Sequence, residues 1–185
     1  MLQKLYEEVL KVGFQACRPD KAIAEMGLTK GAYYHYFESK QDMGYALLDE
    51  VVRPLYLSYW QPLVKGHTPV VAQLIQHLEA RALQGPDRVK NPLSFVIQEM
   101  AGLEPGFHQR LQSLMTDLMT LLEAALEQDQ AKQFIRPELD TKQSARFILA
   151  ALEGISALER LDLDTEEAAL HALIHYLKSL TNHKP

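Results

Sequence analysis

Apolar residues recur with a helical period along almost the whole chain, and no stretch alternates apolar and polar residues as a half-buried strand does. Leu2, Leu5 and Val9, for example, would lie on one side of a first helix that ends at Gly13. Glycine and proline interrupt this period at short intervals, so the pattern predicts about nine separate helices. We therefore expect an all-α protein.

Two short helices, separated by Gly27, are expected to follow the first. Pro19 suits the first turn of one of them. The inward side of this helix is expected to consist of Ile23, Ala24 and Met26. Thr29 can cap the second short helix, and Ser39 can cap the helix that comes after it.

Prolines, glycines and capping residues mark the later boundaries. Pro54 and Pro62 are expected to kink or segment the fourth helix. Further helices are expected to start at Thr68-Pro69, Asn91-Pro92 and Glu104-Pro105, and to end at Gly85-Pro86 and Gly102. Capping-box pairs are expected at Asp140 with Gln143 and at Asp164 with Glu167.

The composition excludes several classes of protein. A chain of 185 residues, 47% hydrophobic and 23% charged, can form one domain or two small ones and is not compositionally disordered. The single cysteine, Cys17, excludes an internal disulfide framework and a cysteine-rich zinc module. The apolar run at residues 147–152 is far shorter than the roughly 18 residues of a membrane span. We expect a cytoplasmic protein with no membrane contact, metal or cofactor.

The charge is distributed unevenly along the chain. The formal net charge is −5, yet residues 1–45 contain six lysines or arginines and six acidic residues. The whole excess of negative charge therefore lies in residues 46–185. A neutral front part permits contact with nucleic acid without demonstrating it.

The stretch from residue 20 to residue 40 has the pattern of a helix-turn-helix. Leu28, Tyr33 and Phe37 are expected to be buried on one side of its second helix. The residues left pointing outward are Thr29, Lys30, Ala32, Tyr34 and Tyr36. Such small, hydroxyl and amine groups suit a DNA major groove, and Lys40 adds a phosphate contact. An aromatic core helix is the alternative for the three tyrosines, and we accept it for Tyr33 alone.

The second helix of this motif resembles the recognition-helix signature of TetR-like transcriptional regulators. The matching residues are Gly27-Leu28-Thr29-Lys30-Gly31-Ala32-Tyr33-Tyr34-His35-Tyr36-Phe37-Glu38-Ser39-Lys40. Upstream, Ile23-Ala24 and Gly13-Phe14 match further landmarks of the family. The chain departs from the family pattern where Cys17-Arg18-Pro19 replaces a threonine-rich cap and where Tyr33 replaces leucine.

The resemblance implies a helix-turn-helix DNA-binding domain at residues 1–45, here called the head. It also implies a C-terminal helical ligand-binding and dimerisation domain at residues 46–185. The implied DNA contacts are Arg18, Thr29, Lys30, Gly31, Ala32, Tyr34, His35, Tyr36 and Lys40. The expected partners are a double-stranded DNA operator and a small-molecule effector of apolar or amphipathic character.

The last two helices are apolar on more than one side. Apolar residues occupy nearly every direction of the first of them and more than one face of the second. Such helices must be covered on both sides, which favours a homodimer through residues of about 141–160 and 165–181. The alternative is that both helices occupy the centre of a monomer. His171 and His175 share a face, but two ligands alone make a weak metal site.

A ligand pocket is expected in the middle of the chain, as the family implies. The residues expected to line it are Tyr56, Trp60, Phe95, Met100, Phe107, Met115 and Met119. The expected polar anchors are Glu99, His108 and Glu153. Each aromatic or methionine residue, taken singly, fits a plain core position equally well. Asn91 stands where one subset of the family has a cysteine, which excludes thiol-based sensing at that position.

Together these features predict a ligand-responsive transcriptional regulator, a repressor that a small molecule releases from a pseudo-palindromic operator. One rival interpretation is a dimeric helical ligand-binding protein with a vestigial DNA head. A small helical enzyme is a second rival, but the sequence offers no nucleophile–base pair, set of metal ligands or phosphate loop. We therefore expect no enzyme activity.

Overall fold

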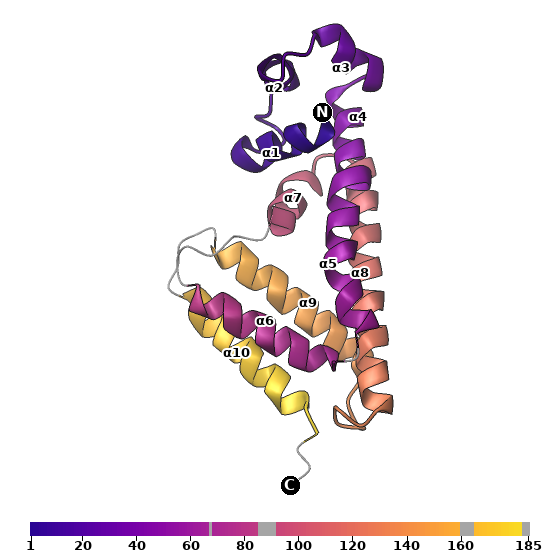
Figure 1. The fold of residues 1–185 in the computed structure, drawn as a ribbon, viewed down its shortest axis with the longest axis vertical. Helices are drawn as coiled ribbons and strands as arrows, with labels where there is room; N and C mark the ends of the chain where they lie inside the picture. The colour runs from indigo at the N-terminus through magenta and orange to yellow at the C-terminus, as the bar shows by residue number, and fades with distance from the viewer. Residues whose placement is uncertain (67, 85–91, 160–164, 183–185) are drawn as a thin grey trace. The chain divides into compact units, whose positions relative to one another are not determined.

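The computed structural model describes residues 1–66, 68–84, 92–159 and 165–182. In this part of the chain the regular structure is helical (Figure 1). The strand-like pairing among these residues is limited to one isolated antiparallel bridge between Ile135 and Thr181. The all-α prediction is therefore confirmed.

Four short helices make up the front of the chain: α1 (Leu2–Val12), α2 (Pro19–Glu25), α3 (Lys30–Tyr36) and α4 (Lys40–Ala46). Gly13 follows α1 with a φ of 88°, which glycine adopts without strain. The Thr29 hydroxyl accepts a hydrogen bond from the Ala32 N–H at 3.2 Å. The Ser39 hydroxyl accepts one from the Asp42 N–H at 3.0 Å. Both predicted N-caps are confirmed.

A π-helical turn interrupts the fourth helix of the chain. α4 leads directly into η1 (Leu47–Val52), which leads into α5 (Arg53–Lys65). Pro54 lies in the first turn of α5, where its missing N–H and its ring are tolerated. The segmentation predicted at Pro54 is thus confirmed, whereas α5 continues through Pro62 to its end.

The later described helices are α6 (Val70–Leu83), α7 (Pro92–Met100), α8 (Pro105–Ala131), α9 (Thr141–Leu158) and α10 (Thr165–Leu180). With α4, η1 and α5 counted as one interrupted helix, the described residues form nine helices, as predicted. The Asp140 carboxylate accepts a hydrogen bond from the Gln143 N–H at 2.9 Å, which confirms this cap. The predicted stop at Gly85-Pro86 and the predicted cap Asp164 lie outside the described residues.

The chain divides into two compact units. The first contains Met1–Leu57 and Pro92–Met115, and the second contains Ser58–Asn91 and Thr116–Pro185. This boundary does not coincide with the functional division predicted at residue 45, because parts of α7 and α8 pack with the head. None of the described helices is both long enough and apolar enough to cross a membrane.

Small residues allow the elements of the first unit to pack closely. A Cβ added to Gly44 on α4 would lie 2.7 Å from the Phe107 ring of α8 and 2.8 Å from the Phe14 ring. These two rings form an edge-to-face pair with centroids 5.2 Å apart. A Cβ added to Gly106 would likewise overlap the Tyr45 side chain. Two glycines therefore let α4 and α8 approach one another within this unit.

In the second unit, α10 packs against α6 and α9 (Figure 1). Buried aliphatic residues on these three helices include Leu74, Leu78, Ile148, Leu149, Leu173 and Leu177. A partly buried ion pair accompanies them: Arg81 Nη2 lies 2.6 Å from each carboxylate oxygen of Glu159, and the side chains of Arg81 and Glu159 are 20% and 1% exposed. Its contribution to stability is considered in the Discussion.

Candidate nucleic-acid interface

Helices α2 and α3 pack against each other across a glycine turn. Gly27 has a φ of 71°, in the left-handed region that favours glycine. The Leu28 N–H donates to the Ile23 carbonyl at 3.0 Å, and the Gly27 N–H donates to the Ala24 carbonyl at 2.9 Å. These bonds close the end of α2 and set the start of α3, which gives the predicted helix-turn-helix.

The inward side of α3 is aromatic. Tyr33 and Phe37 are buried, with ring centroids 5.4 Å apart. The Tyr33 hydroxyl donates to the Ser39 carbonyl at 3.5 Å, and burial raises the pKa of this phenol to about 12. Tyr33 is therefore neutral at physiological pH and has a packing role, as the sequence predicts.

Two predictions about inward residues are wrong. Leu28 is 40% exposed, because α3 begins only at Lys30 and Leu28 therefore precedes the helix whose inner face it was expected to share. Ala24 is exposed as well, and Met26 is only half-buried. The core of the head is formed instead by residues such as Ile23 and Tyr33.

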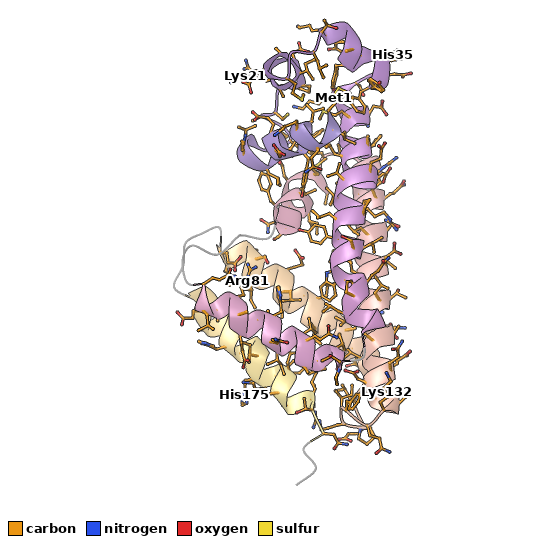
Figure 2. The ribbon with its side chains drawn as sticks, in the orientation of Figure 1. Met1, Lys21, His35, Arg81, Lys132 and His175 are labelled. Carbon is orange, nitrogen blue, oxygen red and sulfur yellow. The ribbon has the colours of Figure 1, made fainter. Side chains whose placement is uncertain are left out.

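The outward side of α3 carries the predicted DNA-contacting residues. Tyr34 is 56% exposed and Tyr36 is 68% exposed. Thr29, Lys30, Gly31 and His35 are exposed too, and Ala32 is half-buried. Figure 2 shows the side chain of His35 directed away from the ribbon. The structure thus leaves most of these side chains accessible to solvent, while their contact with DNA remains a prediction.

A cavity of about 600 Å³ lies beside this face. It is lined by Cys17, Arg18, Pro19, Asp20, Lys21, Tyr33, Tyr34 and Lys40. The cavity unites two predicted phosphate contacts, Arg18 and Lys40, with Lys21, which the sequence analysis did not single out. Lys21 could have been identified from the sequence, because Arg18 and Lys21 stand at positions i and i+3, which places both on the same side at the start of a helix.

Lys30 has an intramolecular partner in the free protein. Its Nζ lies 2.5 Å from Oδ2 of Asp20, on the neighbouring helix α2. The hydrogen bond to Asp20 raises the pKa of Lys30, and the lysine therefore stays charged. Asp20, which the sequence analysis also missed, thus partly neutralises a predicted DNA contact.

Replacing Asp20 by asparagine is expected to strengthen DNA binding about threefold to tenfold at low salt. The substitution removes a negative charge from the interface and releases Lys30 to a phosphate, and both effects are screened by added salt. Titration of one selected DNA fragment at two salt concentrations measures the change. Glu127→Gln, which removes an exposed acid from α8, is the control. Unchanged or weaker binding by Asp20→Asn would contradict this role.

The candidate pocket residues fall in both compact units. In the first unit, Phe107 packs against Phe14 and Tyr45, with ring centroids 5.2 and 5.0 Å apart. Glu99 accepts hydrogen bonds from two backbone N–H groups of the head, and His108 is exposed. Tyr56, Phe95 and Met115 of this unit are half-buried, as are Met119 and Glu153 of the second. Trp60 of the second unit is buried. The effector-binding role of these residues remains a prediction.

Helix α9 exposes apolar residues, whereas the large apolar residues of α10, such as Leu173 and Leu177, are buried within the single chain. Phe147 is 51% exposed, and its ring lies edge-to-face with Tyr176, at a centroid distance of 4.6 Å. Ala150 and Gly154, which follow Phe147 at helical spacing, are exposed as well. No group of three or more His, Cys, Asp or Glu among the described residues is placed to hold a metal ion.

Comparison with known proteins identifies the C-terminal part of the chain. Residues 92–175 match the family model described as the tetracyclin repressor-like C-terminal domain. No curated protein matches the sequence. All solved structures named below are less than 25% identical, so they are evidence for a shared fold.

Three solved structures illustrate this fold. Reduced NemR from Escherichia coli has a TM-score of 0.81 and 18% identity, over 98% of this chain and 95% of that one. A TetR transcriptional regulator from Chloroflexus aurantiacus has a TM-score of 0.78 and 23% identity, over 97% and 93%. Regulatory protein TetR from Rhodobacter sphaeroides has a TM-score of 0.76 and 20% identity, over 97% and 96%.

Proposed function

We propose that the chain is a member of the TetR family of transcriptional regulators, and that it is a repressor that a small molecule releases from a pseudo-palindromic operator. Members of this family are regulators and not enzymes. The observation that carries the DNA-binding part of the proposal is the exposed face of α3. Tyr34 and Tyr36 are both exposed on this helix, and Tyr34 also lines the cavity that contains Arg18, Lys21 and Lys40.

In this proposal α3 enters the major groove of the operator. Lys30 and Thr29, at the start of α3, reach a base edge or a phosphate, and the small side chain of Ala32 lets the helix backbone approach. The hydroxyls of Tyr34 and Tyr36 donate to phosphate oxygens, and Lys40 adds a charged contact. Phosphate contacts supply most of the affinity, so binding must weaken steeply with salt.

The operator would be read by two heads. A homodimer through α9 and α10 has two-fold symmetry, and half-sites about one helical turn of DNA apart, roughly 34 Å, would match it. The exposed residues Phe147, Ala150 and Gly154 of α9 support this interface.

The effector would act by preferring one state of the dimer. An apolar or amphipathic molecule bound to the middle of the chain would stabilise the state in which the heads do not match the operator. A coupling free energy of about 1–3 kcal/mol between the two sites is typical of such regulators. An effector that weakens DNA binding without changing the separation or mobility of the heads would contradict this account.

Substitution of Tyr34 and of Lys40 by alanine tests the DNA-binding proposal. Each variant is expected to bind a selected genomic fragment about fivefold to thirtyfold more weakly, and Lys40→Ala should also reduce the salt slope by about one. Lys132→Ala, which removes an exposed lysine from the second unit (Figure 2), is the matched control. Circular dichroism and sedimentation check that fold and dimer are retained.

The outcome separates the proposal from its rival. If neither variant binds DNA more weakly than the control does, α3 is not the DNA-binding face. A well-folded dimer that selects no DNA fragment even at low salt would favour the alternative function, a ligand-binding protein with a vestigial head. This alternative is favoured by the ion pair of Lys30 with Asp20 and by the hydrogen bond that the Lys40 ammonium donates to the Gln15 carbonyl, because both engage predicted DNA contacts within the protein.

A further inference from the structure

Glu99, near the end of α7, binds the turn that follows α1. The Phe14 N–H donates to its Oε2 at 2.6 Å, and the Gln15 N–H donates to its Oε1 at 2.8 Å. These partners are 85 and 84 residues away in sequence, and all three residues belong to the first compact unit. A carboxylate that accepts two consecutive backbone N–H groups makes two charge-assisted hydrogen bonds.

The backbone of this turn is shaped to receive the carboxylate. Gly13 directly precedes the two donors and has a φ of 88°. A Cβ added to it would lie 2.9 Å from Oε1 and 3.2 Å from Oε2 of Glu99. Any larger residue would therefore be strained twice, by its φ and by its overlap with the carboxylate. The conformation of Gly13 is thus a second observation, separate from the two hydrogen bonds, that the turn accommodates the Glu99 carboxylate.

The same turn also holds Lys40. The Lys40 ammonium donates to the Gln15 carbonyl at 2.8 Å and lies 5.2 Å from the centroid of the Phe14 ring. Phe14 and Gln15 thus contact Glu99 through their N–H groups and Lys40 through a ring and a carbonyl. A short chain of direct contacts connects α7 with the ammonium at the start of α4.

We infer that Glu99 is a positioning residue for Lys40, and that it sets the strength of the phosphate contact made by the head. This inference rests on the DNA-binding role proposed above. The inferred function of Glu99 differs from the one expected from the sequence, which was to bind the effector as a polar anchor of the ligand pocket. Both carboxylate oxygens are engaged by the head, and the DNA-contacting end of the protein is thereby connected to the tetracyclin repressor-like segment 92–175.

The energetic basis is preorganisation. Lys40 has a long side chain with several rotamers, and ordering it during DNA binding costs entropy. A turn held in place by Glu99 orders the carbonyl and ring that keep this side chain in position before DNA arrives. Loss of the carboxylate would also leave the partly buried Phe14 N–H and the exposed Gln15 N–H without their acceptor, which loosens the turn.

A double-mutant cycle tests the inference. Glu99→Gln has nearly the same shape as the native residue but presents no charge to the two N–H groups, and Glu99→Asp keeps the charge on a shorter side chain. Glu127→Gln is the control for loss of an exposed acid. Each of these three substitutions is made both in the native protein and in the Lys40→Ala variant. The binding of every protein to one selected DNA fragment is then measured over a range of salt concentrations.

Glu99→Gln is expected to weaken DNA binding about fivefold in the native protein and to have little effect in Lys40→Ala, since coupled residues are not additive. Glu99→Asp should lose less. Amide hydrogen exchange at Phe14 and Gln15 should become faster in Glu99→Gln. This readout reports the turn itself, whether or not DNA is bound.

Two results would overturn the inference: an unchanged affinity in both Glu99 variants, or the same fold loss with and without Lys40. If Lys40→Ala and Tyr34→Ala leave DNA binding intact, the proposed function itself fails. If those two variants weaken binding while the Glu99 variants do not, only the inference fails. The aspartate variant keeps the test decisive should Glu99→Gln not fold.

Discussion

Replacing Phe147 by glutamate is expected to convert the proposed homodimer into monomers and to weaken operator binding by more than about 100-fold. Phe147 is 51% exposed in the single chain, and its ring rests on Tyr176 of α10. In a two-fold interface each copy of this side chain is buried against the partner. Two carboxylates brought into an apolar interface without partners would prevent its formation.

The loss of DNA binding follows from the loss of the dimer. Two joined heads bind their half-sites with a high effective concentration, whereas separate heads must bind independently. Sedimentation or light scattering measures the mass, and titration of a selected fragment measures the affinity.

A second exposed phenylalanine supplies the control. Phe134, in the connection after α8, is 41% exposed and lies outside the predicted dimer helices. Phe134→Glu should therefore remain dimeric and bind DNA normally. A Phe147→Glu protein that stays dimeric, or a Phe134→Glu protein that dissociates equally, would rule out the interface through α9 and α10.

Removal of Arg81 is expected to lower the free energy of unfolding by about 3–5 kcal/mol. Its guanidinium lies 2.6 Å from both oxygens of Glu159, which is almost fully buried after α9. Arg81→Ala removes both short contacts between the guanidinium and this buried carboxylate inside the second unit, and removal of one partner of a buried ion pair is costly. The free energy from urea unfolding measures the effect.

The same unit contains a matched surface pair. Lys178 on α10 and Glu79 on α6 lie 2.6 Å apart, but both side chains are about half exposed. Lys178→Ala should therefore cost no more than about 1 kcal/mol. Arg81→Met combined with Glu159→Leu should recover much of the loss, because it removes both charges together. An Arg81→Ala protein no less stable than Lys178→Ala would contradict this assignment.

Features that depend on a few neighbouring residues could be predicted from the sequence. The caps at Thr29, Ser39 and Asp140, and the interruption near Pro54, all follow from interactions within a single helical turn. The inward position of Tyr33 follows from helical spacing. The error at Leu28 arose because helical spacing was extended to a residue that precedes both the N-cap Thr29 and the first residue of α3, Lys30.

Features that depend on distant residues could not be predicted in this way. The sequence offered Glu99 as a polar anchor for an effector, and it gave no sign that its oxygens accept hydrogen bonds from backbone groups about 85 residues away. Asp20 opposite Lys30 was missed because each is unremarkable within its own helix. The pairing of Arg81 with Glu159 was missed for the same reason.

Local sequence was enough to specify an all-α chain, the ends of most of its helices and a helix-turn-helix whose second helix presents tyrosines outward. Helical period, capping and glycine turns act over a few residues, so they can be recognised without knowing the fold. Tertiary packing alone requires glycine at position 44 and determines which acidic side chains form ion pairs with which basic ones. It also places Glu99 of α7 against the turn that contacts Lys40. These contacts exist only once distant segments are brought together, because hydrogen bonds and van der Waals contacts act over a few ångströms regardless of separation along the chain.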